Sequence, residues 1–582
     1  NPSALVSTNE LAIHMGLPRH SVRGLPVVEH AVFGQEVITR KRNDTDKINL
    51  GTIYNMGQST QTKVELDVNS LAMHTFITGS TGSGKSNAVY HLLDEIKKKD
   101  IPFLVVEPAK GEYKDVFKNV KCYGTNPLIG ELLRINPFSF PEGIHVLEHI
   151  DRIVEIFNVC WPMYAAMPAV LKESIENAYK SAGWDLNVSE NEKVEGLFPT
   201  FDDVLRELHT TINSSEYSSD TKGDYIGSLA TRLKSLTNGI NGRIFVSDEM
   251  NLAELFDESA IIDISRVGSV ETKSLIMGLV VMKLQEYRMA NAEGMNVPLK
   301  HITVLEEAHN LLKKTSTEQS ADSSNMLGKS VEMLTNAIAE IRTFGEGFII
   351  VDQAPNMLDT AAIRNTNTKI VLRLPESTDR DITGNSIALK EQQFGEISKL
   401  PTGIAAVYQN DWQEAVLCAL PKYESYDFSI KQKKNTVVNN LKKSKAENNQ
   451  LLHMLIKEKI AAQEVDTVKS MIIHSNIAAK IRKDLILNLE NRNLAYEWAV
   501  ADFIKKNYNL SDVFRGTQKE NWNDLSELGN IMAHNLQSEF SDFSEFEMLQ
   551  VLYYVCRIEH ERYPEHHLIE KLRVDYLREK VF

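Results

Sequence analysis

Eight consecutive residues have the types and spacing needed to hold a nucleoside triphosphate. The run Gly79-Ser80-Thr81-Gly82-Ser83-Gly84-Lys85-Ser86 matches the pattern G-x-x-x-x-G-K-S/T at every position. Glycines let successive backbone N–H groups converge on phosphate oxygens. Lys85 can reach the β- and γ-phosphates, and the Ser86 hydroxyl can bind Mg²⁺. We therefore predict that ATP and Mg²⁺ bind along these residues, with Asn87 completing the site.

A pair of adjacent carboxylates, Glu306 and Glu307, could supply the hydrolytic chemistry. They follow the apolar run 302–305, and ligands bind at the carboxyl ends of strands in parallel sheets. In such pairs the first acid holds Mg²⁺ through water, and the second orients or deprotonates the attacking water. The pattern predicts a metal role for Glu306, shared with Ser86, and a base role for Glu307.

Four other residues have both a functional and a structural interpretation. Gln353 either contacts the γ-phosphate or its attacking water, or caps a loop as a strand-end amide. Arg342 either stabilises transition-state charge in a neighbouring subunit, or is a surface arginine of an ordinary helix. Glu107 and Glu112 either lie close to the nucleotide or are ordinary strand-end acids. The residues alone leave these alternatives open.

These side chains need a sheet to position them. Compact apolar runs alternate with helical stretches, which indicates an α/β core with a parallel sheet covered on both faces. The phosphate loop then joins a strand to a helix whose dipole favours the phosphates. The expected strands are 73–78, 102–107, 260–264, 301–306, 347–351, 369–374 and 403–409.

The pattern along the chain predicts three parts. Short alternating segments in residues 1–70 indicate an N-terminal β segment. The nucleotide-binding core covers 71–425 and carries a helical insertion at about 138–255. Helical periodicity predicts a C-terminal helical region over 426–582. Within it, the lysine-rich stretch 431–445 is either a solvated linker or helix start, or a basic patch that faces DNA.

Length and composition fit a multidomain protein of the cytoplasm. A chain of 582 residues exceeds what one hydrophobic core supports. Its four cysteines form no C-x-x-C pair, which suits a reducing compartment, and the longest apolar stretch, 275–282, is too short to cross a bilayer. A net charge of −15 argues against nucleic-acid affinity over the whole surface but permits a local basic stripe. We expect no membrane association.

Five segments of the chain together resemble a known family. They are 78–86, 106–113 (Val-Glu-Pro-Ala-Lys-Gly-Glu-Tyr), 134–138 (Arg-Ile-Asn-Pro-Phe), 305–311 (Leu-Glu-Glu-Ala-His-Asn-Leu) and 352–355 (Asp-Gln-Ala-Pro). The set resembles the HerA branch of the HerA/FtsK superfamily, hexameric ATP-driven DNA translocases with a RecA-like core. The resemblance spans about residues 45–420. One departure is Ala354, because the family usually has arginine there, and any role of that arginine is absent here.

The resemblance implies a RecA-like P-loop NTPase core in a homo-hexameric ring that translocates double-stranded DNA or acts as a helicase on it. The strands around Leu50 and Gly51 resemble the end of the family's N-terminal β-barrel. The site residues that it implies are Lys85 and Ser86 for nucleotide and metal, Glu306 and Glu307 for hydrolysis, Gln353 as a sensor and Arg342 as an arginine supplied in trans.

The resemblance also implies a partner. HerA proteins often work with a separate nuclease, and related ATPases of anti-phage systems pair with nuclease or sirtuin-type NAD-consuming effectors. No nuclease carboxylate cluster is recognisable in this sequence, so we expect an effector on another chain that docks on the helices beyond 430. Two alternatives stay open: an export ATPase of the type IV secretion or conjugation kind, and a nucleotide-dependent scaffold for an effector.

Overall fold

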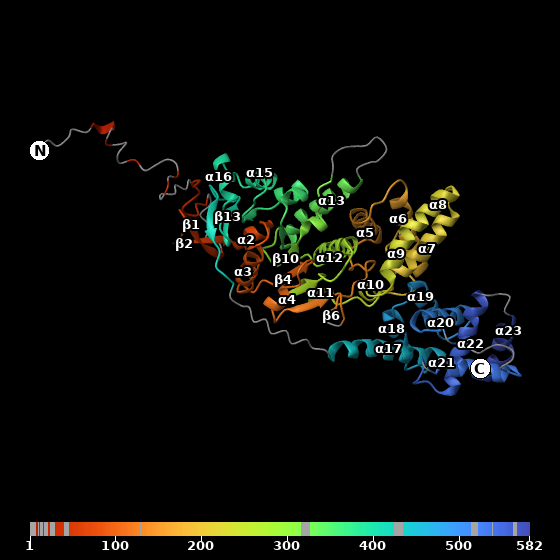
Figure 1. Ribbon diagram of the computed structural model, residues 1–582. Helices are drawn as coiled ribbons and strands as arrows, with labels where there is room; N and C mark the ends of the chain where they lie inside the picture. Colours follow the sequence, from red (N-terminus) through yellow and green to blue (C-terminus); the bar gives the residue numbers. More distant parts are fainter. Residues whose placement is uncertain are drawn as a thin grey trace. The chain divides into compact units, whose positions relative to one another are not determined.

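The structure is a computed structural model, drawn as a ribbon in Figure 1. The chain forms two compact units. The first unit is Asn1–Lys99 with Val351–Glu424, and the second is Asp100–Ile350 with Ser425–Phe582. The residues that the structure describes are 7–9, 11, 16, 21, 23, 30–39, 46–127, 130–315, 326–423, 435–511, 513, 522–537, 539–562 and 567–581.

The strands of the first unit pair in both parallel and antiparallel directions. In sheet order they are β2 (Gln58–Asp67), β1 (Lys47–Asn55), β14 (Val416–Ala419), β13 (Ile404–Gln409), β12 (Thr368–Val371) and β3 (Thr75–Thr78). β12 and β3 pair in parallel, whereas the pairs from β12 through β13, β14 and β1 to β2 are antiparallel. The parallel direction expected for 403–409 is therefore wrong, because β13 runs antiparallel to its neighbour β12. A short turn after β13 then returns the chain as β14 in a hairpin.

The N-terminal β segment is a hairpin in the described residues. β1 pairs with β2, and Thr52 and Ile53 of β1 pair with the edge of β14. Gly51 permits this close approach, since a Cβ there would lie 2.2 Å from the Ala419 carbonyl oxygen. The barrel-like character expected for this segment is not confirmed.

The helices of the first unit alternate with its strands along the chain. They are α2 (Val68–Leu71), α3 (Lys85–Lys97), η4 (Pro355–Met357), α14 (Thr360–Arg364), α15 (Ser377–Ser386) and α16 (Glu391–Ile397). In α3, apolar side chains at helical spacing, such as Val89, Leu93 and Ile96, are buried. This burial fixes the helix that follows the phosphate loop.

The strands of the second unit provide the parallel part of the fold. In sheet order they are β11 (Glu346–Asp352, whose last two residues belong to the first unit), β10 (His301–Glu306), β4 (Phe103–Glu107), β9 (Ala260–Asp263), β5 (Lys121–Gly124) and β6 (Glu131–Leu132). From β10 to β6 every neighbouring pair is parallel. β10 and β4 are buried along their whole length, as expected for central strands of a covered sheet. With small shifts at their ends, all seven predicted strands are confirmed.

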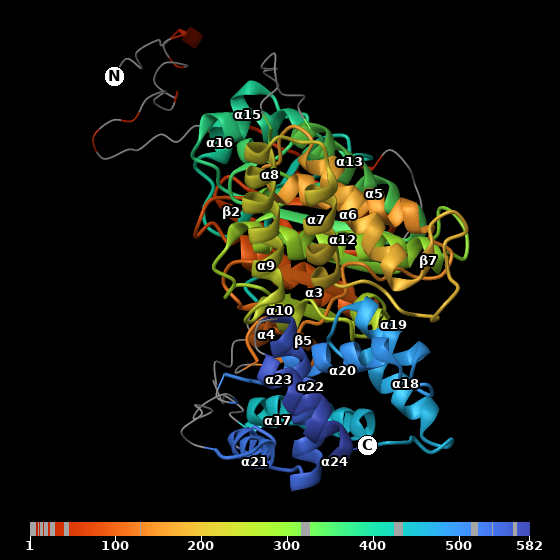
Figure 2. The same cartoon turned by 90° about the vertical axis from the view of Figure 1, so that its right-hand side faces the viewer.

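Helices account for most of the remaining second unit. Those between β6 and β9, called the insertion helices here, are α5 (Val146–Cys160), α6 (Met167–Ala182), α7 (Phe201–Ser214), α8 (Ser219–Tyr225), η1 (Ile226–Ala230), α9 (Thr231–Thr237), α10 (Asn241–Ile244) and α11 (Leu252–Phe256). α7 contacts both α6 and α9 (Figure 2), and the short strands β7 (Trp184–Asp185) and β8 (Glu190–Asn191) form a hairpin. The helices around the central strands are α4 (Tyr113–Val116), α12 (Val270–Ala290), η2 (Ala308–Asn310), α13 (Met326–Glu340) and η3 (Ile341–Phe344).

The C-terminal part is helical, as the periodicity predicts. Its helices are α17 (Asn435–Ile456), α18 (Val465–His474), α19 (Ala479–Leu487), α20 (Leu494–Asn507), α21 (Leu525–Leu536), α22 (Glu545–Arg562), α23 (His567–Lys571), η6 (Leu572–Leu577) and α24 (Arg578–Val581). They share a core that includes Leu452, Phe503, Phe540 and Tyr554. Of the lysine-rich stretch, residues 431–434 lie outside the described residues.

Asp203 joins the insertion helices to the C-terminal helices. Its carboxylate accepts hydrogen bonds from the backbone N–H and hydroxyl of Thr200 in the capping box of α7. It also accepts from the N–H groups of Ala479 (2.7 Å) and Lys480 (3.2 Å), at the positive end of α19. Arg482 donates to the carbonyl oxygen of Phe198 at 2.8 Å. Buried polar contacts thus fix this interface.

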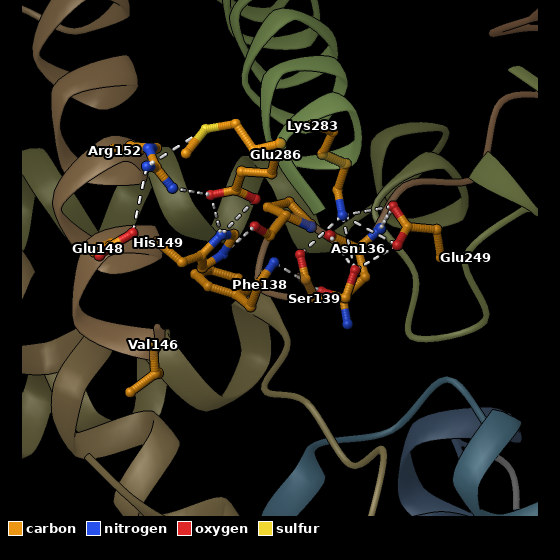
Figure 3. Close-up of polar contacts among 12 residues, drawn as sticks. Asn136, Phe138, Ser139, Val146, Glu148, His149, Arg152, Glu249, Lys283 and Glu286 are labelled. Carbon is orange, nitrogen blue, oxygen red and sulfur yellow. Dashed lines mark hydrogen bonds and ion pairs between the residues drawn. The ribbon is translucent and has the colours of Figure 1, made fainter. Parts of the chain in front are cut away.

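Two buried ionic groups hold the segment after β6 (Figure 3). In the first, Lys283 of α12 donates to the carbonyl oxygen (3.0 Å) and hydroxyl (2.7 Å) of Ser139 and pairs with Glu249 at 2.8 Å. Glu249 also accepts from the backbone N–H of Asn136 at 3.3 Å. These contacts anchor the 134–138 motif to α12.

In the second group, both ring nitrogens of His149 face acceptors. Nε2 lies 3.1 Å from the carbonyl oxygen of Pro137, and Nδ1 lies 3.0 Å from Glu286, which also pairs with Arg152 at 3.2 Å (Figure 3). Burial favours the neutral form of Glu286, but the charge and hydrogen bond of His149 and the charges of Lys283 and Arg152 lower its pKa below the ordinary value. His149 therefore links α5 both to Glu286 of α12 and to the backbone of the segment after β6.

Candidate functional site

The phosphate loop of the first unit joins β3 to α3. β3 is buried along its length, and α3 begins at Lys85. Gly82 and Gly84 have φ angles of 75° and 103°, in the left-handed region that favours glycine. The loop therefore turns tightly into the N-terminus of α3, an arrangement suited to binding phosphate.

Backbone hydrogen bonds from distant segments brace this loop. The N–H of Ser80 donates to the carbonyl oxygen of Arg373 at 2.8 Å, just after β12. The N–H of Gly403 donates to the carbonyl oxygen of Ser83 at 2.9 Å, just before β13. Neither Arg373 nor Gly403 belongs to a recognised sequence motif, so their contacts with the loop could not be predicted from the sequence.

Gln353 lies beside the phosphate loop. The Thr81 hydroxyl donates to Gln353 Oε1 at 2.8 Å, so the amide and the loop are in direct contact within the first unit. Lys85 Nζ donates to the carbonyl oxygen of Gly79 at 2.9 Å, which holds the ammonium group over the loop. Both predicted residues are thus at the loop itself.

Ser86 and Asn87 form the first turn of α3 after Lys85. The Asn87 side chain contacts the segment after β14: its Nδ2 donates to the carbonyl oxygen of Pro421 at 2.9 Å, and its Oδ1 accepts from the N–H of Tyr423 at 2.8 Å. Asn87 therefore ties this segment to α3, and its nucleotide role stays a prediction.

In the second unit, Glu306 and Glu307 occupy the carboxyl end of β10. Glu306 is 9% exposed and accepts a hydrogen bond from the Tyr113 hydroxyl. Glu307 has φ 46° and ψ 50°, a conformation uncommon for residues with side chains and concentrated at functional sites. The N–H and Nδ2 of Asn310 donate to the Glu307 carbonyl oxygen at 3.0 and 2.9 Å, which holds this turn. His309 Nδ1 lies 3.6 Å from a Glu307 carboxylate oxygen.

Glu107 ends β4, next to β10, and belongs to the same group of acids. Its buried carboxylate accepts hydrogen bonds from the N–H groups of Glu112 (2.7 Å) and Tyr113 (3.3 Å). Burial, followed by the charges of Asp263 and Glu306, outweighs these hydrogen bonds and raises the pKa of Glu107 to about 7. Glu107 thus lies near Glu306, and its closeness to a nucleotide stays a prediction.

We expect Glu107→Gln to make the stability of the protein less dependent on pH. Folding raises the pKa of Glu107 from its ordinary 4.5 to about 7, so its stabilising contribution is complete below pH 4.5 and is lost as the pH rises through 7. Between about pH 5 and pH 8 the wild type should lose roughly 2–3 kcal/mol of unfolding free energy relative to the variant. Chemical denaturation of both proteins at both pH values measures their unfolding free energies. If the difference between wild type and variant is the same at the two pH values, the prediction is wrong.

Arg342 lies in η3, directly after α13, and its side chain is exposed. No ion pair of Arg342 is present in the described part of the chain. None of the helices described is long and apolar enough to cross a membrane.

A glycine-rich loop between a strand and a helix, with Lys85 at the helix start, and a buried strand that ends in Glu306 and Glu307 are the parts of a P-loop ATPase. Residues 48–284 match the family model for the central domain of the helicase HerA. The fold and the motifs thus define a P-loop ATPase, and the match to the family model relates it to HerA.

The DNA double-strand break repair helicase HerA of Sulfurisphaera tokodaii is 23% identical over 386 residues, which cover 64% of this chain and 71% of that protein. The helicase of the same name from Sulfolobus acidocaldarius is 26% identical over 399 residues, which cover 64% of this chain and 71% of that protein. Among solved structures, VirB4 of Thermoanaerobacter pseudethanolicus has a TM-score of 0.48 at 16% identity, over 66% of this chain and 98% of that one. Residues 48–284 thus match the central domain of HerA, and the chain is similar to HerA helicases over about 64% of its length.

Proposed function

We propose that this protein uses ATP hydrolysis to move along double-stranded DNA as a ring of identical subunits. The observation that carries the proposal is the match of residues 48–284 to the HerA central domain, together with relatives that are DNA double-strand break repair helicases. Because the chain has a net charge of −15, DNA affinity would come from local basic positions that contact phosphates. Such binding is independent of base sequence.

The proposed roles follow from side-chain chemistry. Lys85 and the loop N–H groups bind the phosphates, and Gln353, in contact with Thr81, responds to the state of the γ-phosphate. Glu307 accepts a proton from the attacking water. Ser86 and Glu306 each have the side-chain chemistry to hold Mg²⁺, because this ion prefers hydroxyl, carboxylate and water oxygens. When bound, Mg²⁺ neutralises charge that develops on the transferred phosphoryl group.

We further propose a homo-hexamer in which Arg342, whose side chain is exposed, serves the nucleotide of the next subunit. An arginine supplied in trans contributes about 10³–10⁵ in rate. We also propose a nuclease or sirtuin-type effector on a separate chain, acting in DNA processing or anti-phage defence. The C-terminal helices would receive it.

Duplex DNA should raise the ATPase rate several-fold, whatever its base sequence, because DNA contacts would couple to the nucleotide cycle. The stimulation should fall steeply between about 50 and about 200 mM salt, as counterions compete for the phosphates. A steady-state assay with duplexes of two unrelated sequences measures both effects.

An ATPase rate that duplex DNA does not change at low salt would contradict the proposed translocation along DNA. An effector that keeps its activity when bound to Glu307→Gln would favour the scaffold function instead. Copurification with an inner-membrane complex would favour an export ATPase.

A further inference from the structure

Tyr113 contacts two of the acids at the strand ends of the second unit. Its hydroxyl donates to Glu306 Oε1, and its backbone N–H donates to Glu107 Oε2 at 3.3 Å. The residue is 2% exposed, so its ring is packed in the protein interior. One residue therefore links the end of β10 to the end of β4.

The turn from β4 to α4 is anchored on both sides of Tyr113. Before it, Gly111 has φ 72°, and a Cβ there would lie 3.1 Å from Asp263 Oδ2. After it, Lys114 pairs with the same carboxylate at 2.5 Å. Because glycine alone combines this φ angle with this space, and the ion pair fixes the next residue, the Tyr113 hydroxyl has a defined position.

A hydroxyl that donates to one oxygen of a carboxylate fixes the rotation of the carboxylate group. It thereby sets the direction in which the remaining lone pairs point. Removing a group that orients a metal ligand in this way costs about 10–100-fold in metal affinity or activity. A residue needed only for packing would require the ring but not the hydroxyl.

We propose that Tyr113 is a positioning residue that orients the Glu306 carboxylate to bind the divalent cation of the nucleotide complex. This inference rests on the metal role of Glu306 in the proposed function.

Tyr113→Phe tests the inference, because it removes only the hydroxyl. The probe is Mn²⁺, titrated into the full chain with a non-hydrolysable ATP analogue and followed by the electron paramagnetic resonance of free Mn²⁺. We expect the variant to bind Mn²⁺ about tenfold more weakly than the wild type. Its affinity for the analogue without metal should be unchanged.

Tyr179→Phe is the matched control. Tyr179 is also fully buried, and its hydroxyl donates to the carbonyl oxygen of Phe138 rather than to Glu107 or Glu306. Its Mn²⁺ affinity should equal that of the wild type. Wild-type affinity in Tyr113→Phe, or an equal loss in both variants, would overturn the positioning role while the proposed function stands. If Mn²⁺ binding with the analogue is absent in the wild type, or unaffected by Lys85→Ala, the proposed function fails and the inference with it.

Discussion

Glu307→Gln should bind ATP like the wild type and hydrolyse it about 10²–10⁴-fold more slowly. Glutamine has nearly the same shape, so the left-handed turn held by Asn310 should persist. Its amide cannot accept a proton from the attacking water. Fluorescent nucleotide binding and a phosphate-release assay measure the two quantities separately.

The matched control is Glu112→Gln, which changes an acid whose side chain pairs with Lys110 at 3.4 Å. This variant should keep most of the wild-type rate. Normal hydrolysis by Glu307→Gln would exclude Glu307 as the base, and the search would move to the other acids near β10.

Lys85→Ala should lower the ATPase rate by at least about 10²–10³-fold and also weaken nucleotide binding, which Glu307→Gln should not do. Lys85 is held over the loop by the Gly79 carbonyl oxygen, and this contact is exchangeable for phosphate oxygens. A charged donor contributes more than a neutral one at such a position. Equilibrium binding of a fluorescent nucleotide and steady-state turnover measure the two losses.

Lys97→Ala, an exposed lysine in the last turn of the same helix, is the control for loss of a positive charge. It should leave both quantities unchanged. If Lys85→Ala keeps wild-type nucleotide binding and turnover, the loop at 79–86 is not the phosphate site, and the proposed function is wrong.

The phosphate loop and the main strands could be predicted because their signals are local. The glycine and lysine spacing is complete within eight residues, and β4 and β10 are continuous apolar runs. Such patterns need no knowledge of what packs against them.

The positions that support the site depend on contacts between distant residues, which no local pattern encodes. Tyr113 and Glu306 are 193 residues apart in the chain. The short strand β14 (Val416–Ala419), which receives the N-terminal hairpin, has only four residues and was not predicted. Because β14 was not predicted from the sequence, the N-terminal hairpin had no visible partner strand and was interpreted as the end of a barrel.

The interface around Asp203 has a consequence for biosynthesis. Its partners Ala479 and Lys480 follow 276 and 277 residues later in the chain. At about 5–20 residues per second, a ribosome needs roughly 15–55 s to deliver them after Asp203. During that interval the nascent insertion helices expose a carboxylate and neighbouring surface that only the last quarter of the polypeptide covers, so this interface forms late in synthesis.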